Sequence, residues 1–120
     1  MDNTIDAVRL ALGLHTLRAQ AAAANVAGAG RPDAIAQRYD FAGVEAALRE
    51  AAHASDGVEQ ARWLQAAGAT LHDLRPTQDG EIRLDAEMAE IAAASMDYQS
   101  LTEAIGRHFG LMRIAIAGRV

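Results

Sequence analysis

The closing third of the sequence, residues 79–120, most restricts how this chain can fold. Mostly apolar side chains recur there at intervals that alternate between four and three residues. Such a heptad repeat is typical of a helix that packs along its length against another helix. An unbroken helix over residues 86–117 would be about 48 Å long, which is more than a small globular monomer needs. The repeat comprises Leu84, Met88, Ile91, Ser95, Tyr98, Thr102, Ile105, Phe109, Met112 and Ile116.

The composition favours helices and a thin core. The chain has 120 residues, which allows one domain with a modest core. Hydrophobic residues make up 51% of the chain, but aromatic residues make up only 4%. Alanine is the commonest apolar residue, and it forms helices well while burying little surface. We therefore expect stability to come from close helix contacts or from partners.

Charge, cysteine content and hydropathy argue against several kinds of partner and chemistry. The formal net charge of -5 argues against nucleic acid or an anionic membrane as the main partner. There is no cysteine, which excludes disulfides and thiolate chemistry. The acidic start predicts no cleavable signal peptide, and no apolar run is long enough to span a membrane.

The amino-terminal stretch predicts a second long helix over residues 4–27, capped by Asn3 or Thr4. Two apolar stripes lie side by side on it, which suits a helix with neighbours on more than one side. Two glycines and a proline within residues 28–33 end it. The stripes are Leu10, Leu14, Leu17, Ala21 and Ala24, and Ile5, Val8 and Leu12.

The middle of the chain predicts two shorter helices, over residues 41–54 and 58–74, with Asp40 as a cap. Ile82 and Leu84 suggest a very short extended segment, and Asp85 is expected to cap the last helix. Trp63 either fills a small middle core or anchors a contact with a partner.

These elements predict an all-α fold. Residues 1–27 and 84–120 should pair as a coiled-coil-like hairpin, and residues 28–83 should form a connecting loop and a small, partly irregular middle region. Gly106 and Gly110 either permit close approach of a neighbouring backbone or soften the last helix.

The sequence predicts no catalytic, cofactor-binding or metal-ligating residues. The carboxylates of residues 79–90 lack the spacing of a calcium loop and are expected to form a solvated helix start. The histidines lack the spacing of a helical metal site. His72 beside Asp73 could orient a base, but no glycine-framed nucleophile or phosphate loop accompanies it, so an enzyme is the least favoured interpretation.

Two blocks of sequence resemble a known family. The block near the carboxyl end contains three motifs: Leu84-Asp85-x-Glu87-Met88-Ala89, Tyr98-Gln99-x-Leu101-Thr102 and Phe109-x-Leu111-Met112-Arg113-x-Ala115-Ile116. The block near the amino end contains two motifs, Asn25-Val26-Ala27-x-Ala29-x-x-Pro32 and Tyr39-Asp40-Phe41. Together these blocks resemble the bacterial flagellar basal-body rod proteins, in particular those of the proximal rod.

The resemblance implies a structural protein without catalysis or cofactor. Rod proteins are helical subunits whose terminal helices pair and pack against neighbouring subunits, building a tube that transmits torque and surrounds the export channel. The family is exported by the flagellar type III apparatus without a cleaved leader and resides in the basal body, in the rod that spans the periplasm. The implied partners are other rod subunits, further copies of the chain, the membrane-ring junction protein FliE and the export gate.

The expected assembly interface combines the apolar stripes with the matched motifs. Its residues are Leu10, Leu14, Leu17, Asn25, Pro32, Met88, Ile91, Tyr98, Leu101, Ile105, Phe109, Met112 and Ile116. The alternative is a soluble helical-bundle adaptor or export chaperone, which would use the same stripes inside one monomer or dimer. Composition does not separate the two interpretations.

Overall fold

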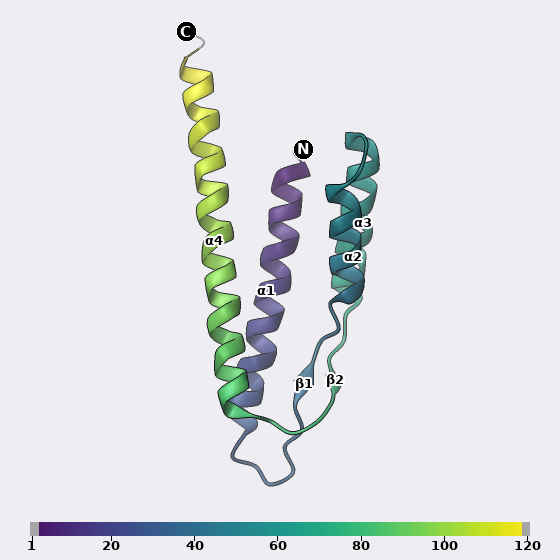
Figure 1. Ribbon diagram of the computed structural model, residues 1–120, viewed down its shortest axis with the longest axis vertical. Helices are drawn as coiled ribbons and strands as arrows, with labels where there is room; N and C mark the ends of the chain where they lie inside the picture. Colours follow the sequence, from purple (N-terminus) through teal and green to yellow (C-terminus); the bar gives the residue numbers. More distant parts are fainter. Residues whose placement is uncertain (1–2, 119–120) are drawn as a thin grey trace.

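The computed structural model describes residues 3–118, apart from the side chain of Met112. Within these residues the chain is mostly helical, as predicted (Figure 1). The elements are α1 (Asn3–Gly28), β1 (Gln37–Arg38), α2 (Ala42–Ala52), α3 (Gly57–Asp73), β2 (Thr77–Gln78) and α4 (Leu84–Ala117).

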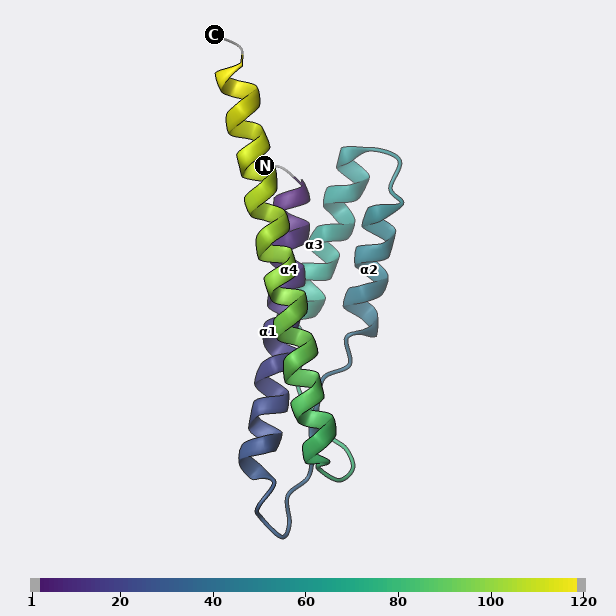
Figure 2. The same cartoon turned by 60° about the vertical axis from the view of Figure 1, so that its left-hand side comes forward.

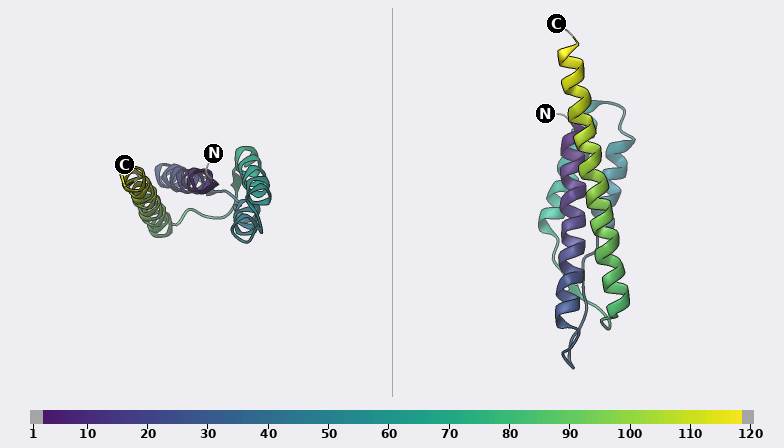
Figure 3. Two further views of the ribbon diagram at one scale, coloured as in Figure 1. Left: turned by 90° about the horizontal axis from the view of Figure 1, so that it is seen from above. Right: turned by 90° about the vertical axis from the view of Figure 1, so that its left-hand side faces the viewer.

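The two long helices, α1 and α4, lie antiparallel and pack against each other, which confirms the predicted hairpin. Helix α1 lies between α4 on one side and the α2–α3 pair on the other (Figures 1 and 3). With 34 residues against 26, α4 is the longer helix, and its last turns extend past the start of α1. The result is an elongated molecule of 65 × 27 × 18 Å, in which the long helices run side by side (Figure 2).

The apolar core joins α1 to the α2–α3 pair rather than to α4. Its buried centre consists of Leu14, Val44, Ala47 and Ala67. Trp63 packs against this centre, so the tryptophan fills the middle core. Gly13 lets α3 come close, because a Cβ atom there would lie 3.3 Å from the Leu71 side chain.

The two connections beside the α2–α3 pair form a short antiparallel ladder. Strand β1 pairs with β2, and Ala36 extends the ladder through hydrogen bonds with Asp79 and Gly80. Gly80 has a φ of 75°, a left-handed conformation that glycine adopts without strain. The extended segment predicted at Ile82 and Leu84 is therefore misplaced, and Leu84 is the first residue of α4.

Two predicted helix caps are also shifted. Arg83 occupies the N-cap position of α4, and Asp85 lies in the first turn, where its charge still suits the helix dipole. Phe41 precedes α2, and the Asp40 side chain accepts a hydrogen bond from the Ala42 N–H at 3.0 Å. In both cases a carboxylate serves the helix start without occupying the expected position.

Helix α4 turns a different stripe towards α1 than the heptad repeat predicts. The buried residues are Glu87 and Ala94, each one position before the predicted Met88 and Ser95. Ile91 and Ile105 are half-buried, so the predicted stripe is correct there. Small Ala94 allows close packing, while ion pairs made by α4 carboxylates select the orientation of the helix. Met88 is consequently left exposed.

Candidate assembly surface

A polar cluster joins α1 to α4 near the middle of their contact. The Nε of Arg18 donates a hydrogen bond to Glu90 Oε1 at 2.6 Å, and its Nη1 donates to Asp97 Oδ2 at 3.3 Å. Nη1 also lies 2.9 Å from His15 Nδ1. Because one guanidinium on α1 binds two carboxylates on α4, the cluster fixes the register of the long helices.

The cluster shifts the pKa values of two of its members, His15 and Arg18. Burial lowers the pKa of His15, and the nearby positive charge of Arg18 lowers it further. Asp97 opposes this effect. The hydrogen bond to Glu90 raises the pKa of Arg18. Nδ1 of His15 accepts the hydrogen bond from Arg18 only while it carries no proton, so the geometry favours a neutral imidazole.

This arrangement predicts that mild acid destabilises the fold through His15. Below its ordinary pKa of 6.5, the unfolded chain takes up a proton at His15 while the folded chain resists it. Stability should therefore fall as pH drops through 6.5 towards the lower folded pKa. The measurement is urea unfolding at about pH 7.5 and about pH 5.5.

The variant His15→Gln should lose less stability between the two pH values than the wild type. His53→Gln is the matched control, because it makes the same substitution at an exposed position at the end of α2, outside the cluster. If both variants reduce the loss of stability equally, His15 is not the source of the pH dependence.

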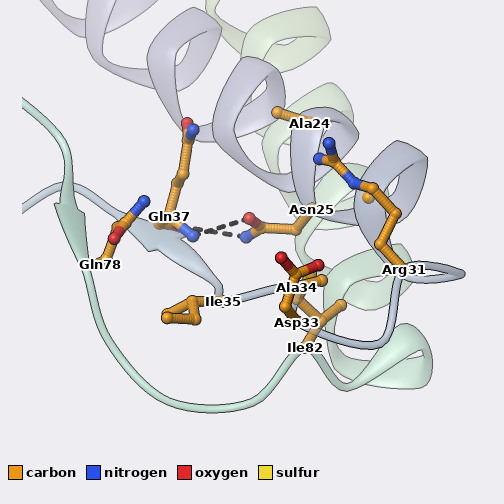
Figure 4. Close-up of a pocket in the computed structure, with 10 residues that line it drawn as sticks. Ala24, Asn25, Arg31, Asp33, Ala34, Ile35, Gln37, Gln78 and Ile82 are labelled. Carbon is orange, nitrogen blue, oxygen red and sulfur yellow. Dashed lines mark hydrogen bonds between the residues drawn. The ribbon is translucent and has the colours of Figure 1, made fainter.

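A second polar site anchors the loop after α1 (Figure 4). Asn25 is buried, and its Oδ1 accepts from the Gln37 backbone N–H at 2.7 Å while its Nδ2 donates to the Gln37 carbonyl at 3.0 Å. The side chain thus serves the edge of β1 as a neighbouring strand would. A pocket of about 300 Å³ opens beside this pair, with Arg31 and Asp33 at its wall.

Replacing Asn25 with alanine should destabilise the fold by about 1–3 kcal/mol, because the partly buried N–H and C=O groups of the Gln37 backbone lose their partner. Urea unfolding measures the change, with Gln20→Ala on the exposed face of the same helix as the control. A similar effect of the two substitutions would show that the hydrogen bonds of Asn25 contribute little.

The sequence predicts that the carboxylates of residues 79–90 are solvated, and for Glu87 this prediction is wrong. Its side chain is only 2% exposed, and Arg38 Nη1 lies 2.5 Å from Glu87 Oε1. Neither carboxylate oxygen has an aligned hydrogen bond within the described residues, so this contact is a close ion pair. It ties β1 to the first turn of α4.

The structure divides the predicted interface residues into two groups. Those buried or half-buried inside the chain are Leu10, Leu14, Leu17, Asn25, Ile91, Leu101 and Ile105. Those with exposed side chains are Pro32, Met88, Tyr98, Phe109 and Ile116. Met112 lies in α4, but its side chain is outside the described residues. The assembly role of these residues stays a prediction. The second group is the more accessible to another subunit, and half-buried members of the first group, such as Ile91, are partly accessible.

Several large apolar side chains are exposed near the end of α4. We call residues 109–117 the overhang, since the last turns of α4 extend past the start of α1 (Figure 1). Leu111, Ile114 and Ile116 are 66%, 69% and 67% exposed, and Phe109 is 46% exposed. No described residue approaches the Cα of Gly106 or Gly110 closely enough to contact a Cβ placed there, so close approach to either glycine is not used within the chain.

A second apolar feature lies between the long helices. It is a groove of about 450 Å³ with one wall from α1 and the other from α4. We call it the α1–α4 groove. Its lining residues are His15, Thr16, Ala19, Gln20, Ala23, Ile91, Ala94, Ser95 and Tyr98.

Comparison with protein-family models, with curated proteins and with solved structures finds no match. Among the described residues, no group of histidine and carboxylate side chains is placed to hold a metal ion. None of the described helices is long and apolar enough to cross a membrane. His72 and Asp73 are both exposed at the end of α3. The long helical hairpin and its exposed apolar end are thus the features on which a function can be argued.

Proposed function

We propose that this chain is a structural subunit of the bacterial flagellar basal-body rod, of the proximal FlgB type, and that it has no enzymatic activity. The observation that carries the proposal is the pairing of α1 with a longer α4 that ends in exposed apolar residues. The sequence blocks that resemble rod proteins lie on or beside these two helices. A hairpin of this shape supplies what a helical tube requires of its subunits, because each copy offers long faces to several neighbours.

In this proposal, assembly depends on apolar burial between copies. Burial contributes about 25 cal/mol per Å² of apolar area, offset by the cost of ordering the helices. The overhang offers large side chains, whereas much of α1 and α4 is alanine and gives each contact little energy. Individual contacts should therefore be weak, and the closed geometry of the tube should make them stable by number. The subunit would surround the export channel and transmit torque.

The same proposal names the location and the neighbours. The chain would reach the rod through the flagellar export apparatus without a cleaved leader. It would contact other rod subunits and further copies of itself, with FliE and the export gate at the rod base.

The test is a clean deletion in the source bacterium, with complementation by the intact gene. We expect loss of swimming, and electron microscopy should show basal bodies that stop before the rod. Normal flagella after deletion would contradict the proposal and favour the adaptor or export-chaperone alternative. That alternative would use the α1–α4 groove to hold a client segment.

A further inference from the structure

We infer that copies of this chain stack head to tail, with the overhang of one copy seated in the α1–α4 groove of the next copy. The inference deepens the proposed function and rests on it, because an open contact that repeats is one way for a subunit to extend a rod. The partner is a second copy of the same chain, and the contact joins two different surfaces.

The two surfaces suit each other in shape and polarity. The overhang is a lone helix that presents Phe109, Leu111, Ile114 and Ile116 to solvent. The groove offers small residues, Ala19, Ala23 and Ala94, between which large side chains can insert. A helix that lays its apolar face in such a groove is a common mode of recognition. Each surface is left open within its own chain.

Charge favours the same pairing. Arg18 contacts the groove-lining His15 and faces both Glu90 and Asp97, so this cluster beside the groove keeps a net negative charge while His15 is neutral. The Asp97 side chain is 53% exposed and lies 3.8 Å from His15, which lines the groove. The overhang carries Arg113 and no carboxylate. Seating it in the groove brings opposite charges together, whereas pairing two overhangs brings like charges together.

The fold also sets the direction of the stack. The overhang continues α4 along the long axis of the molecule (Figures 1 and 2). The α4 wall of the groove is formed by residues 91–98, which lie nearer the start of α4. A displacement along this axis, combined with a sideways offset of about one helix width, brings one surface to the other. Because the two surfaces differ, the contact is heterologous, and without rotational closure it repeats as an open stack.

Disulfide cross-linking tests the stack directly, since the chain contains no cysteine. The variants Ala23→Cys in the groove and Ile114→Cys in the overhang are purified, mixed and oxidised. We expect mixed disulfide dimers to form about tenfold faster than in a control mixture of Ile114→Cys with Val58→Cys, because docking raises the effective concentration. Val58 is a fair control, being 74% exposed and on α3, away from the groove.

A chain that carries both cysteines should give a ladder of multimers. The stack is ruled out if the double-cysteine chain stops at a dimer closed by two disulfides. It is also ruled out if Ile114→Cys dimers form as fast as the mixed dimers. Equal cross-linking with Val58→Cys would also overturn it. Circular dichroism checks that each variant remains helical, and the substitutions sit at exposed positions that the core does not use.

A charge reversal at Arg113 tests whether the overhang charge guides docking. Adding Arg113→Glu to the overhang variant should reduce the cross-linking rate severalfold. Arg62→Glu makes the same charge change at an exposed position of α3 and should leave the rate unchanged. Equal losses for the two variants would show that the overhang charge does not guide docking.

The outcomes separate the stack from the rod role. A ladder from a protein whose deletion leaves flagella normal would remove the rod role and keep head-to-tail stacking. A deletion that stops rod assembly, with no cross-link between groove and overhang, would keep the rod role and remove this contact.

Discussion

Replacing Leu14 with alanine is expected to lower the free energy of unfolding by about 2–5 kcal/mol. Leu14 is only 5% exposed and belongs to the buried centre that joins α1 to the α2–α3 pair. Two of its neighbours there, Ala47 and Ala67, are too short to fill the space that the substitution leaves. Domains of this kind are stable by only about 5–15 kcal/mol, so the loss is a large fraction of the total. Urea denaturation followed by circular dichroism measures it.

The matched control is Leu111→Ala, the same chemical change at a position that is 66% exposed. We expect it to alter stability by less than about 0.5 kcal/mol. If the two substitutions destabilise the chain equally, the core of the isolated molecule does not lie between α1 and the α2–α3 pair.

Replacing Phe109 with aspartate is expected to abolish swimming while export of the chain continues. Phe109 is 46% exposed and lies outside the buried core, so the variant should fold normally. In an assembled rod, however, a carboxylate at this position would be buried in an apolar contact without a partner, which costs several kcal/mol. Motility in soft agar, secretion of the variant and electron microscopy of basal bodies are the three measurements.

Two further variants sharpen this result. Ile105→Asp should also abolish swimming, but Ile105 is half-buried, so that variant should lose stability as well. Val58→Asp introduces the same charge at an exposed site on α3 and should swim normally. A Phe109→Asp strain that swims like the wild type would show that the overhang is not an assembly surface.

The helices could be predicted from the sequence because their signals are local. Residues 28–33 contain the glycines and proline that end α1, and the predicted bounds of each helix agree with the structure to within about two residues. The β1–β2 ladder could not be predicted, because each strand has two residues and the pairing joins segments far apart in the chain. Such short strands carry no alternating pattern to detect.

The orientation of α4 could be predicted only in part. The heptad repeat correctly indicated a helix that packs lengthwise, but α4 carries apolar residues on several faces. The ion pair of Arg18 with Glu90 favours the face of α4 that meets α1, and the ion pair of Arg38 with Glu87 holds the first turn of α4 against β1. Arg18 and Glu90 are 72 residues apart in the sequence, so no local sequence motif predicts their ion pair.

The exposed part of the candidate surface could be predicted from the sequence, whereas the groove could not. Phe109 and Ile116 were expected at an interface, and both are exposed. The groove depends on Ala19 and Ala23, and small residues on a helix give no signal that distinguishes a groove wall from a solvated face. Only the packing of the two long helices reveals it.

Chain order has a consequence for how this molecule becomes competent to bind. Helices α2 and α3 are joined by a short turn, so they should fold together early, whereas α1 and α4 must bring the two ends of the chain together. One wall of the groove comes from each end. A chain whose two ends have not yet come together therefore lacks this surface. If copies bind one another through the groove as proposed, such a chain should not bind a second copy through it.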